Sequence, residues 1–205
     1  MDLLILAALL LGGAYVLKSR EQARRIALLG SHLGEYQIEK LMESLTQGYL
    51  RCLGENDPER RDQIWQLLAS SEQSVASQFS RFASGFAKVD EAQARVSKLP
   101  IAVPFVDKLM PGVTFDLRKA LAIHARGISG AADNVQQLSP KAKAFTMSAE
   151  LFLMQHTCHW FCRSRTVASA RMMARHQTSY ALLLDSVSPT TRSAYLALVG
   201  PRRVS

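Results

Sequence analysis

Several signatures of enzymatic sites are missing from this chain of 205 residues. It has no glycine-rich phosphate loop, no G-x-S-x-G elbow, no H-E-x-x-H pair and no prominent pair of carboxylates. These patterns supply the groups that phosphoryl transfer, acyl transfer and metal-assisted hydrolysis require. Their absence favours a protein that is not an enzyme.

Cysteine and acidic residues are also scarce. Three cysteines, an odd number, do not suggest a disulfide framework, which suits a reducing compartment. Residues 1–100 carry twelve basic and twelve acidic side chains, whereas residues 101–205 carry thirteen and five. The second half of the chain therefore holds the whole net charge of +8.

No acidic residue lies between Glu150 and Asp185, and arginines accumulate there. If this segment is one helix, Arg163, Arg171 and Arg175 fall within about 120° of one another. Such a basic face can contact the phosphates of anionic lipids or of nucleic acid, or it can be a solvated surface. No helix-turn-helix, zinc-finger or RNA-binding pattern accompanies it, so sequence-specific binding of nucleic acid is not expected. These three arginines are the candidate contacts to an anionic surface.

An unbroken apolar run extends from Leu3 to Leu17, with Lys18 and Arg20 directly after it. Its leucine, isoleucine and valine side chains favour insertion into a bilayer by about 3 to 5 kcal/mol. As a helix the run reaches about 22 Å, which is shorter than a hydrocarbon core of roughly 30 Å. Local thinning of the bilayer and snorkelling of the two basic side chains can cover part of this difference.

Two other interpretations compete with a membrane anchor. A secretory signal peptide needs a basic segment before the apolar run, but only Asp2 can ionise there. A buried core helix fits the length but should have a polar face, which this run lacks. We therefore predict that residues 1–20 form a single transmembrane helix. The cations that follow it place the N-terminus outside a bacterial-type inner (plasma) membrane and the rest of the chain in the cytoplasm.

Helical periodicity covers most of the remaining sequence. From Glu35 to Leu53, apolar residues recur every three or four positions, and Asp57-Pro58 is a strong start signal for the next helix. Apolar side chains then recur every seven residues, which predicts one long amphipathic helix from Pro58 to Lys98. A coiled-coil dimer is the alternative, but phenylalanines in the apolar stripe favour packing within a bundle.

The apolar segment 99–115 interrupts the helical pattern. It contains three prolines, which exclude a continuous helix because proline lacks the amide donor and clashes with the preceding turn. We expect a loop packed across the bundle. The alternative is a segment that enters a membrane interface or meets a partner.

Helical signals return at Asp116. Ser139-Pro140 begins a helix that we expect to continue to about Asp185, because no glycine or further proline intervenes. Ser188-Pro189 repeats the same signal for a short last helix. Residues 201–205 are expected to form a disordered tail.

One cluster of side chains has the chemistry of a metal site: His156, Cys158, His159 and Cys162. Imidazole and thiolate are preferred ligands of zinc and also bind haem iron. On a helix the last three share one side, whereas His156 projects about 160° away from Cys158. We favour ordinary core packing, because cysteine behaves as a small buried hydrophobe. A catalytic Cys–His pair is not expected, since no third orienting group is visible.

These patterns together predict an all-α protein with a single transmembrane helix, a cytoplasmic bundle of four to six helices over residues 21–200 and a short tail. The expected role is a membrane-anchored interaction or scaffold protein that binds a partner, or itself, through helical faces. No cofactor is expected in that role. The alternatives are a zinc- or haem-binding protein that uses the 156–162 cluster, and a binder of anionic lipid or nucleic acid that uses the arginines of the 163–175 segment.

Overall fold

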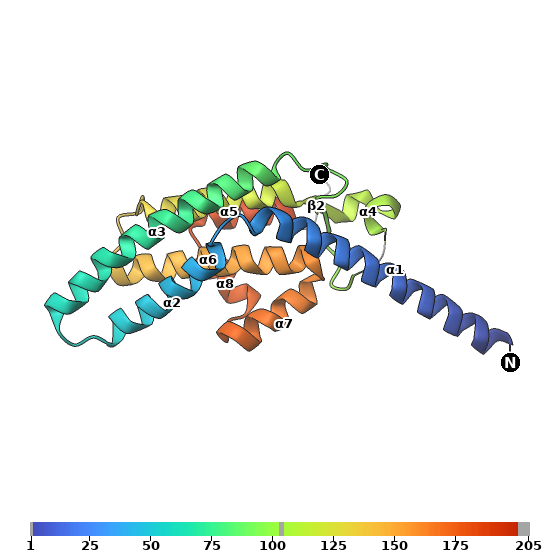
Figure 1. The fold of residues 1–205 in the computed structure, drawn as a ribbon, viewed down its shortest axis with the longest axis horizontal. Helices are drawn as coiled ribbons and strands as arrows, with labels where there is room; N and C mark the ends of the chain where they lie inside the picture. Colours follow the sequence, from blue (N-terminus) through green and yellow to red (C-terminus); the bar gives the residue numbers. More distant parts are fainter. Residues whose placement is uncertain (1, 103–104, 201–205) are drawn as a thin grey trace.

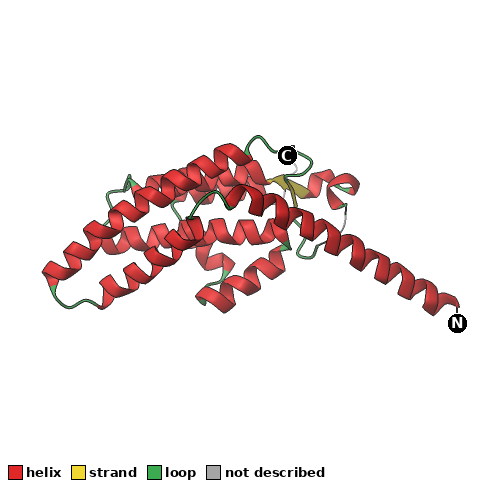
Figure 2. Ribbon diagram, in the orientation of Figure 1, coloured by secondary structure: helices red, strands yellow, loops and turns green. Residues whose placement is uncertain are grey.

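The chain is almost entirely helical, and the described residues add only a short two-stranded sheet (Figure 2). The computed structural model describes residues 2–102 and 105–200, except for the side chains of residues 2–4 and 107–108. The prediction of an all-α fold built around a helical bundle is confirmed.

A long N-terminal helix, α1 (Asp2–Leu33), projects from the body of the molecule. Its first half extends along the long axis of the molecule, and its second half lies against the body (Figure 1). The helices α2 (Ile38–Gly54) and α3 (Pro58–Phe86) follow, and the turn between them lies at the end opposite the N-terminus. The predicted cap of α3 is present, because the carboxylate of Asp57 accepts a hydrogen bond from the amide of Glu59 at 3.0 Å.

The second half of the chain completes the body. Its helices are α5 (Leu117–Ala132), α6 (Pro140–Cys162), α7 (Arg165–His176), α8 (Tyr180–Ser186) and α9 (Pro189–Val199). Ser139 and Ser188 cap α6 and α9 as predicted, since each hydroxyl accepts a hydrogen bond from the amide three residues later.

The helix α6 lies at the centre of the bundle. It contacts α1, α2, α5, α7, α8 and the strand β1 (Arg95–Ser97). Its side chains are apolar around most of the circumference, which is typical of a helix buried on all sides. Trp160 and Phe161 are fully buried, and the indole nitrogen of Trp160 donates to the carbonyl of Ser97 at 2.7 Å. This bond joins the central helix to the sheet.

The helix predicted from Pro58 to Lys98 ends early, at Phe86. Asp90 forms a turn in which its carboxylate accepts a hydrogen bond from the amide of Ala92 at 2.8 Å. Val96, which continued the seven-residue spacing, instead pairs with Phe115 in an antiparallel sheet of β1 and β2 (Thr114–Asp116). The prediction of one long helix was wrong because apolar spacing alone does not distinguish a further helical turn from a buried strand. The helical part packs against α2 and α5, as the bundle interpretation requires.

The helix predicted from Pro140 to Asp185 is broken twice. Ser164 begins α7, since its hydroxyl accepts a hydrogen bond from the amide of Val167 at 3.3 Å. Gln177 then adopts a left-handed conformation with φ of 50°, and Ser179 caps α8. The prediction of a continuous helix was wrong because serine caps, rather than proline or glycine, make both breaks.

The segment 99–115 is not a continuous helix, as its prolines predicted. It contains a single helical turn, α4 (Val106–Leu109), and the 3-10 turn η1 (Pro111–Val113). The backbone carbonyl of Pro100 accepts hydrogen bonds from both the amide and the hydroxyl of Thr166, which ties the segment to α7. Val106 is buried, whereas Ile101 and Leu109 are exposed. The segment therefore packs against the body on one side only.

The predicted anchor and tail have different outcomes. No helix in the described part of the chain is both long and apolar enough to cross a membrane. The helix α1 continues without a break through residue 20, where the anchor was expected to end, as far as Leu33. The predicted tail, residues 201–205, lies outside the described residues.

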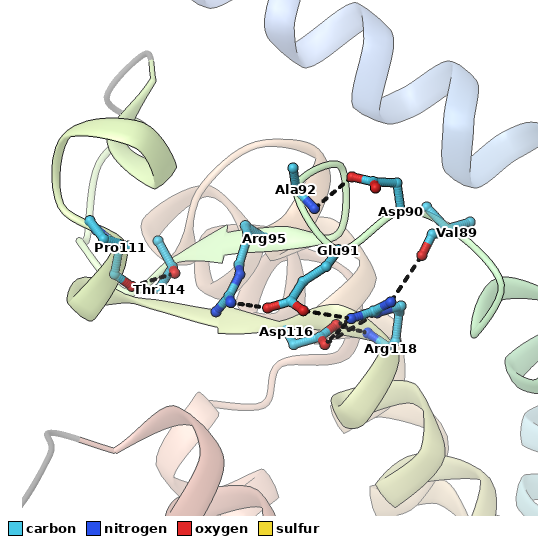
Figure 3. A network of polar contacts seen from close by, with 9 residues as sticks. All are labelled: Val89, Asp90, Glu91, Ala92, Arg95, Pro111, Thr114, Asp116 and Arg118. Atoms are coloured by element: carbon cyan, nitrogen blue, oxygen red, sulfur yellow. Dashed lines mark hydrogen bonds and ion pairs between the residues drawn. The ribbon is translucent and has the colours of Figure 1, made fainter.

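A polar network around Arg118 holds the sheet to the bundle (Figure 3). Asp116 caps α5 by accepting a hydrogen bond from the amide of Arg118, and its carboxylate pairs with the same residue's guanidinium at 2.8 Å. The guanidinium also donates to the carbonyl of Val89 at 3.1 Å and lies 3.4 Å from the carboxylate of Glu91. Burial alone would raise the pKa of Asp116, but the hydrogen bonds and charge of Arg118 bring it below its usual value.

Replacing Arg118 by leucine should lower the free energy of unfolding, because the buried carboxylate of Asp116 loses its counter-charge. The matched control is Arg95→Leu, which removes a more exposed ion pair with Glu91 and should cost less than about 1 kcal/mol. Denaturant unfolding measures both. Equal losses in the two variants would contradict the role given to Arg118.

Candidate functional site

The structure separates the four predicted metal ligands into two groups. Cys158, His159 and Cys162 face a groove between α1, α2, α6 and α7. His156 is fully buried in the core, where its ring stacks on Tyr180 with centroids 4.6 Å apart. Among the residues that the structure describes, no three histidine, cysteine or acidic side chains lie close enough to hold a metal ion. The metal or haem hypothesis therefore gains no ligand set from this geometry.

The groove, called here the basic groove, encloses about 290 Å³. It has an apolar floor, a wall from α6 that carries both cysteine and polar side chains, and an arginine rim. The lining residues are Ile26, Leu29, Gly30, Leu33, Ile38, Glu39, Met42, Met154, Gln155, Cys158, His159, Cys162, Arg163, Arg171 and Arg175. The basic groove thus brings together the two candidate sites that the sequence analysis treated as unrelated.

The two cysteines in the basic groove are thiols rather than thiolates at neutral pH. Burial is the main cause that raises the pKa of Cys162 to about 11, and burial raises the pKa of Cys158 further. The sulfur of Cys158 lies 3.9 Å from the sulfur of Met154. Because a thiolate is the nucleophile and the metal ligand, these two side chains act as apolar wall rather than as reactive groups.

The arginine rim carries more charge than Glu39, the one carboxylate that lines the groove, can neutralise. Arg163 donates to the side-chain oxygen of Gln22 at 2.6 Å, and Arg171 donates to Nδ1 of His159 at 3.2 Å. In the described part of the chain, no carboxylate forms an ion pair with Arg163, Arg171 or Arg175. Burial, together with the charges of Arg171 and Arg175, lowers the pKa of His159 to about 4. The ring is therefore neutral at pH 7 and accepts the hydrogen bond.

The three arginines do not reach the rim in the way that the sequence predicted. Arg163 follows the last residue of α6, whereas Arg171 and Arg175 lie one turn apart on α7. The predicted common face of one helix does not exist, because Ser164 interrupts it. The arginines meet since α7 folds back beside the end of α6.

A second set of polar side chains is buried inside the bundle, and the sequence analysis did not find it. This buried polar cluster consists of His124, Glu150, His156, Thr157 and Tyr195, all fully buried. The hydroxyl of Thr157 donates to the carbonyl of Leu153 and lies 2.9 Å from both Nε2 of His124 and the hydroxyl of Tyr195. The hydroxyl of Thr157 therefore links side chains of two other helices.

The carboxylate of Glu150 fills space that a glycine leaves open. One of its oxygens accepts hydrogen bonds from the amide and the hydroxyl of Ser188, at 3.0 and 2.9 Å. The other oxygen would lie 2.3 Å from a Cβ atom at Gly127. Burial raises the pKa of Glu150 despite the hydrogen bonds from Thr191 and Ser188 that lower it. Helical periodicity could not have revealed this cluster, because its members stand among apolar residues of three helices, α5, α6 and α9.

The buried polar cluster should make stability depend on pH. Burial lowers the pKa of His124 to about 3 and that of His156 to about 4, so the folded protein keeps both rings neutral. In the unfolded chain each ring takes up a proton as the pH falls below about 6.5, whereas in the folded protein it does not. The free energy of unfolding is therefore highest above pH 6.5 and falls by about 2 to 3 kcal/mol per ring between pH 6.5 and 4.5. Acid has the opposite effect on stability through Glu150: because its pKa is raised in the folded protein, protonation of this carboxylate favours folding.

Unfolding in urea from pH 7.5 to 4.5 tests the opposite effects expected of the histidines and of Glu150. His124→Gln should flatten the loss of stability in acid, and Glu150→Gln should make that loss steeper. Parallel pH profiles in wild type and both variants would show that these groups do not set the acid stability.

Comparisons with known proteins give no relative from which a function could be inferred. The sequence matches no protein-family model, and neither the comparison with curated proteins nor that with solved structures found a similar protein. We therefore infer the function from the position and chemistry of the residues described above.

Proposed function

We propose that this protein is a membrane-attached helical scaffold whose N-terminal helix is embedded in a bilayer. The observation that carries this proposal is the exposure of the first half of α1, called here the apolar rod (residues 5–17). Its large apolar side chains are 44–73% exposed: Ile5, Leu6, Leu9, Leu10, Leu11, Tyr15, Val16 and Leu17. Apolar surface of this extent on a projecting helix requires a cover that residues 18–102 and 105–200 do not supply.

A lipid environment fits the apolar rod better than a single protein partner does. At 100° per residue, these side chains leave no sector of the helix wider than about 100° without an apolar group. A second helix would cover only one stripe of such a surface, as in a coiled coil. Lipid chains surround a helix on every side, so they cover the whole rod.

The charges after the rod fit the proposed attachment. Lys18, Arg20 and Arg24 follow it directly, and all three are cations that can snorkel to lipid phosphates. The bias of such cations toward the inner side puts the bundle in the cytoplasm and the N-terminus outside. The rod is about 20 Å long, so a crossing would rely on local thinning of the bilayer.

The segment 99–110 provides a second apolar surface beside the end of the rod. Ile101, Phe105, Leu109 and Met110 are 42–72% exposed within ten residues of one another. The amide of Phe105 donates to the carboxylate of Glu21 in α1 at 3.4 Å, which places this surface one turn past the end of the rod. We propose that the segment lies at the membrane interface, the alternative that its sequence left open.

The opposite end of the molecule offers a surface for a protein partner or a second copy. The α2–α3 hairpin turns there, far from the rod (Figure 1). Leu50, Leu53 and Leu67, near this turn, are 46–72% exposed. A scaffold held at one end would present these leucines away from the membrane, where a partner can reach them.

Charged substitutions in the rod should release the protein from membranes. Leu9→Lys with Leu10→Lys places two cations in the middle of the rod, at about 2.5 to 3.5 kcal/mol each in a bilayer centre. Flotation with phosphatidylcholine vesicles should recover the wild type with the vesicles and leave this variant behind. The matched control, Leu50→Lys with Leu67→Lys, changes equally exposed leucines at the far end and should still float. Flotation of both variants would overturn the proposed attachment.

The interfacial position of the segment 99–110 can be tested with a fluorescent side chain. A tryptophan introduced by Leu109→Trp should be quenched by brominated lipids, because the segment is proposed to touch the acyl boundary. Val135→Trp is the control, since Val135 is equally exposed but belongs to the turn after α5. Quenching of both tryptophans, or of neither, would contradict this placement.

A further inference from the structure

We infer that the basic groove binds a single-chain anionic amphiphile, with its hydrocarbon chain along α1, α2 and α6 and its acid group among Arg163, Arg171 and Arg175. This inference concerns a ligand site and does not depend on membrane attachment. It rests on a cavity with an apolar floor, on charges without acidic partners and on the size of the enclosed space.

The floor of the basic groove selects a hydrocarbon chain. Four side chains of the floor, which come from three helices, are at most 6% exposed: Leu29, Ile38, Met42 and Met154. The two protonated thiols continue this surface along α6. Methionine and thiol sulfur adapt to chains of different shape, which suits a flexible ligand.

The rim of the basic groove selects an anion. Three guanidinium groups and one carboxylate, Glu39, line the groove, so these four side chains give it a net charge of +2. The hydrogen bonds to Gln22 and His159 each use one nitrogen of Arg163 and Arg171 and leave other donors available. Guanidinium forks match the two oxygens of a carboxylate or a phosphate.

The volume of the groove argues against larger occupants. About 290 Å³ lies just below the usual range for ligand pockets, roughly 300–1,000 Å³. A docked helix or folded partner would need an interface of roughly 800 Å² on this side, far more than such a cavity provides. A single chain with a compact acidic head is the occupant that fits both the volume and the charge.

Photocrosslinking of the full-length protein in phosphatidylcholine vesicles tests this inference. The probe is a 12-carbon fatty acid with a photoreactive chain, and mass spectrometry locates the label. We expect label in residues 26–42 and 154–162, removed by competition with dodecanoate. Label restricted to residues 5–17 would overturn the inference, because it would reflect the apolar rod alone.

Competing ligands identify the head group. Dodecanol should compete at least roughly tenfold more weakly than dodecanoate or dodecyl phosphate, because it cannot pair with the arginines. Stronger competition by dodecanoate would identify a fatty acid as the ligand, and stronger competition by dodecyl phosphate would identify a phosphate-headed lipid. Equal competition by all three would overturn the proposed role of the rim.

Two pairs of variants separate the site from general effects. Arg171→Gln with Arg175→Gln should reduce labelling of the groove at least roughly tenfold, whereas Arg51→Gln with Arg126→Gln gives the same net charge and should not. Gly30→Leu should also block labelling, since a Cβ there meets no atom within 4 Å and would extend into open groove. Gly85→Leu, equally free of contacts, is its control. Unchanged labelling in both groove variants would overturn the inference.

Discussion

The burial of α6 over most of its surface is the constraint on which the rest of the structure depends. A helix surrounded in this way must satisfy each polar group that it carries without help from water. Thr157 meets this demand by donating to Leu153 in its own helix, and its oxygen lies 2.9 Å from Nε2 of His124 in α5 and from the hydroxyl of Tyr195 in α9. A single hydroxyl therefore fixes the relative positions of three helices. About two turns earlier on α6, Glu150 accepts from Ser188, the cap of α9, and so ties two of the same helices together.

The same burial explains why the basic groove lies where it does. Toward α5, α8 and α9, the central helix is covered by closely packed side chains, and Thr157 and one oxygen of Glu150 have hydrogen-bond partners there. Toward α1, α2 and α7, it presents smaller side chains, Cys158 and Cys162, and α1 presents Gly30. Small side chains on facing helices leave space between them, and the arginines after the end of α6 close that space from one side. The groove is thus a consequence of side-chain size on helices that are otherwise well packed.

The sequence predicted the features of this fold that depend on local chemistry. The caps at Asp57, Ser139 and Ser188 were found correctly, because capping needs only a short side chain and a nearby amide. The apolar stripes of α2 and α3 were also found, since each reflects burial on one face. The sheet of β1 and β2 was missed, because its pairing joins residues about twenty positions apart and only three residues long on each side.

In the candidate site, too, the residue types were recognised from the sequence, whereas the contacts between distant segments were not. The arginines and the His/Cys cluster were recognised by residue type, but the sequence placed them on one continuous helix. Their actual meeting depends on the cap at Ser164 and on the packing of α7 against α6, and the floor of the groove comes from α1 and α2, more than a hundred residues earlier. His156 shows the reverse case, because a residue adjacent to the cluster in sequence belongs to the core instead.

One helix connects the two functional proposals. The residues of α1 that line the basic groove begin at Ile26, nine positions after the last residue of the apolar rod, Leu17. At about 1.5 Å per residue, this separation is roughly 14 Å. Arg25, between them, donates to the carbonyl of Phe161 at 3.3 Å and lies over the ring of the same residue, so the helix is held against α6 at this point. A bilayer around the rod would therefore bring lipid close to the mouth of a groove that has an apolar floor and a basic rim. An amphiphile leaving that bilayer would move only a short distance along α1 to reach the groove. Its hydrocarbon chain would be covered by lipid at the start and by the apolar floor of the groove at the end.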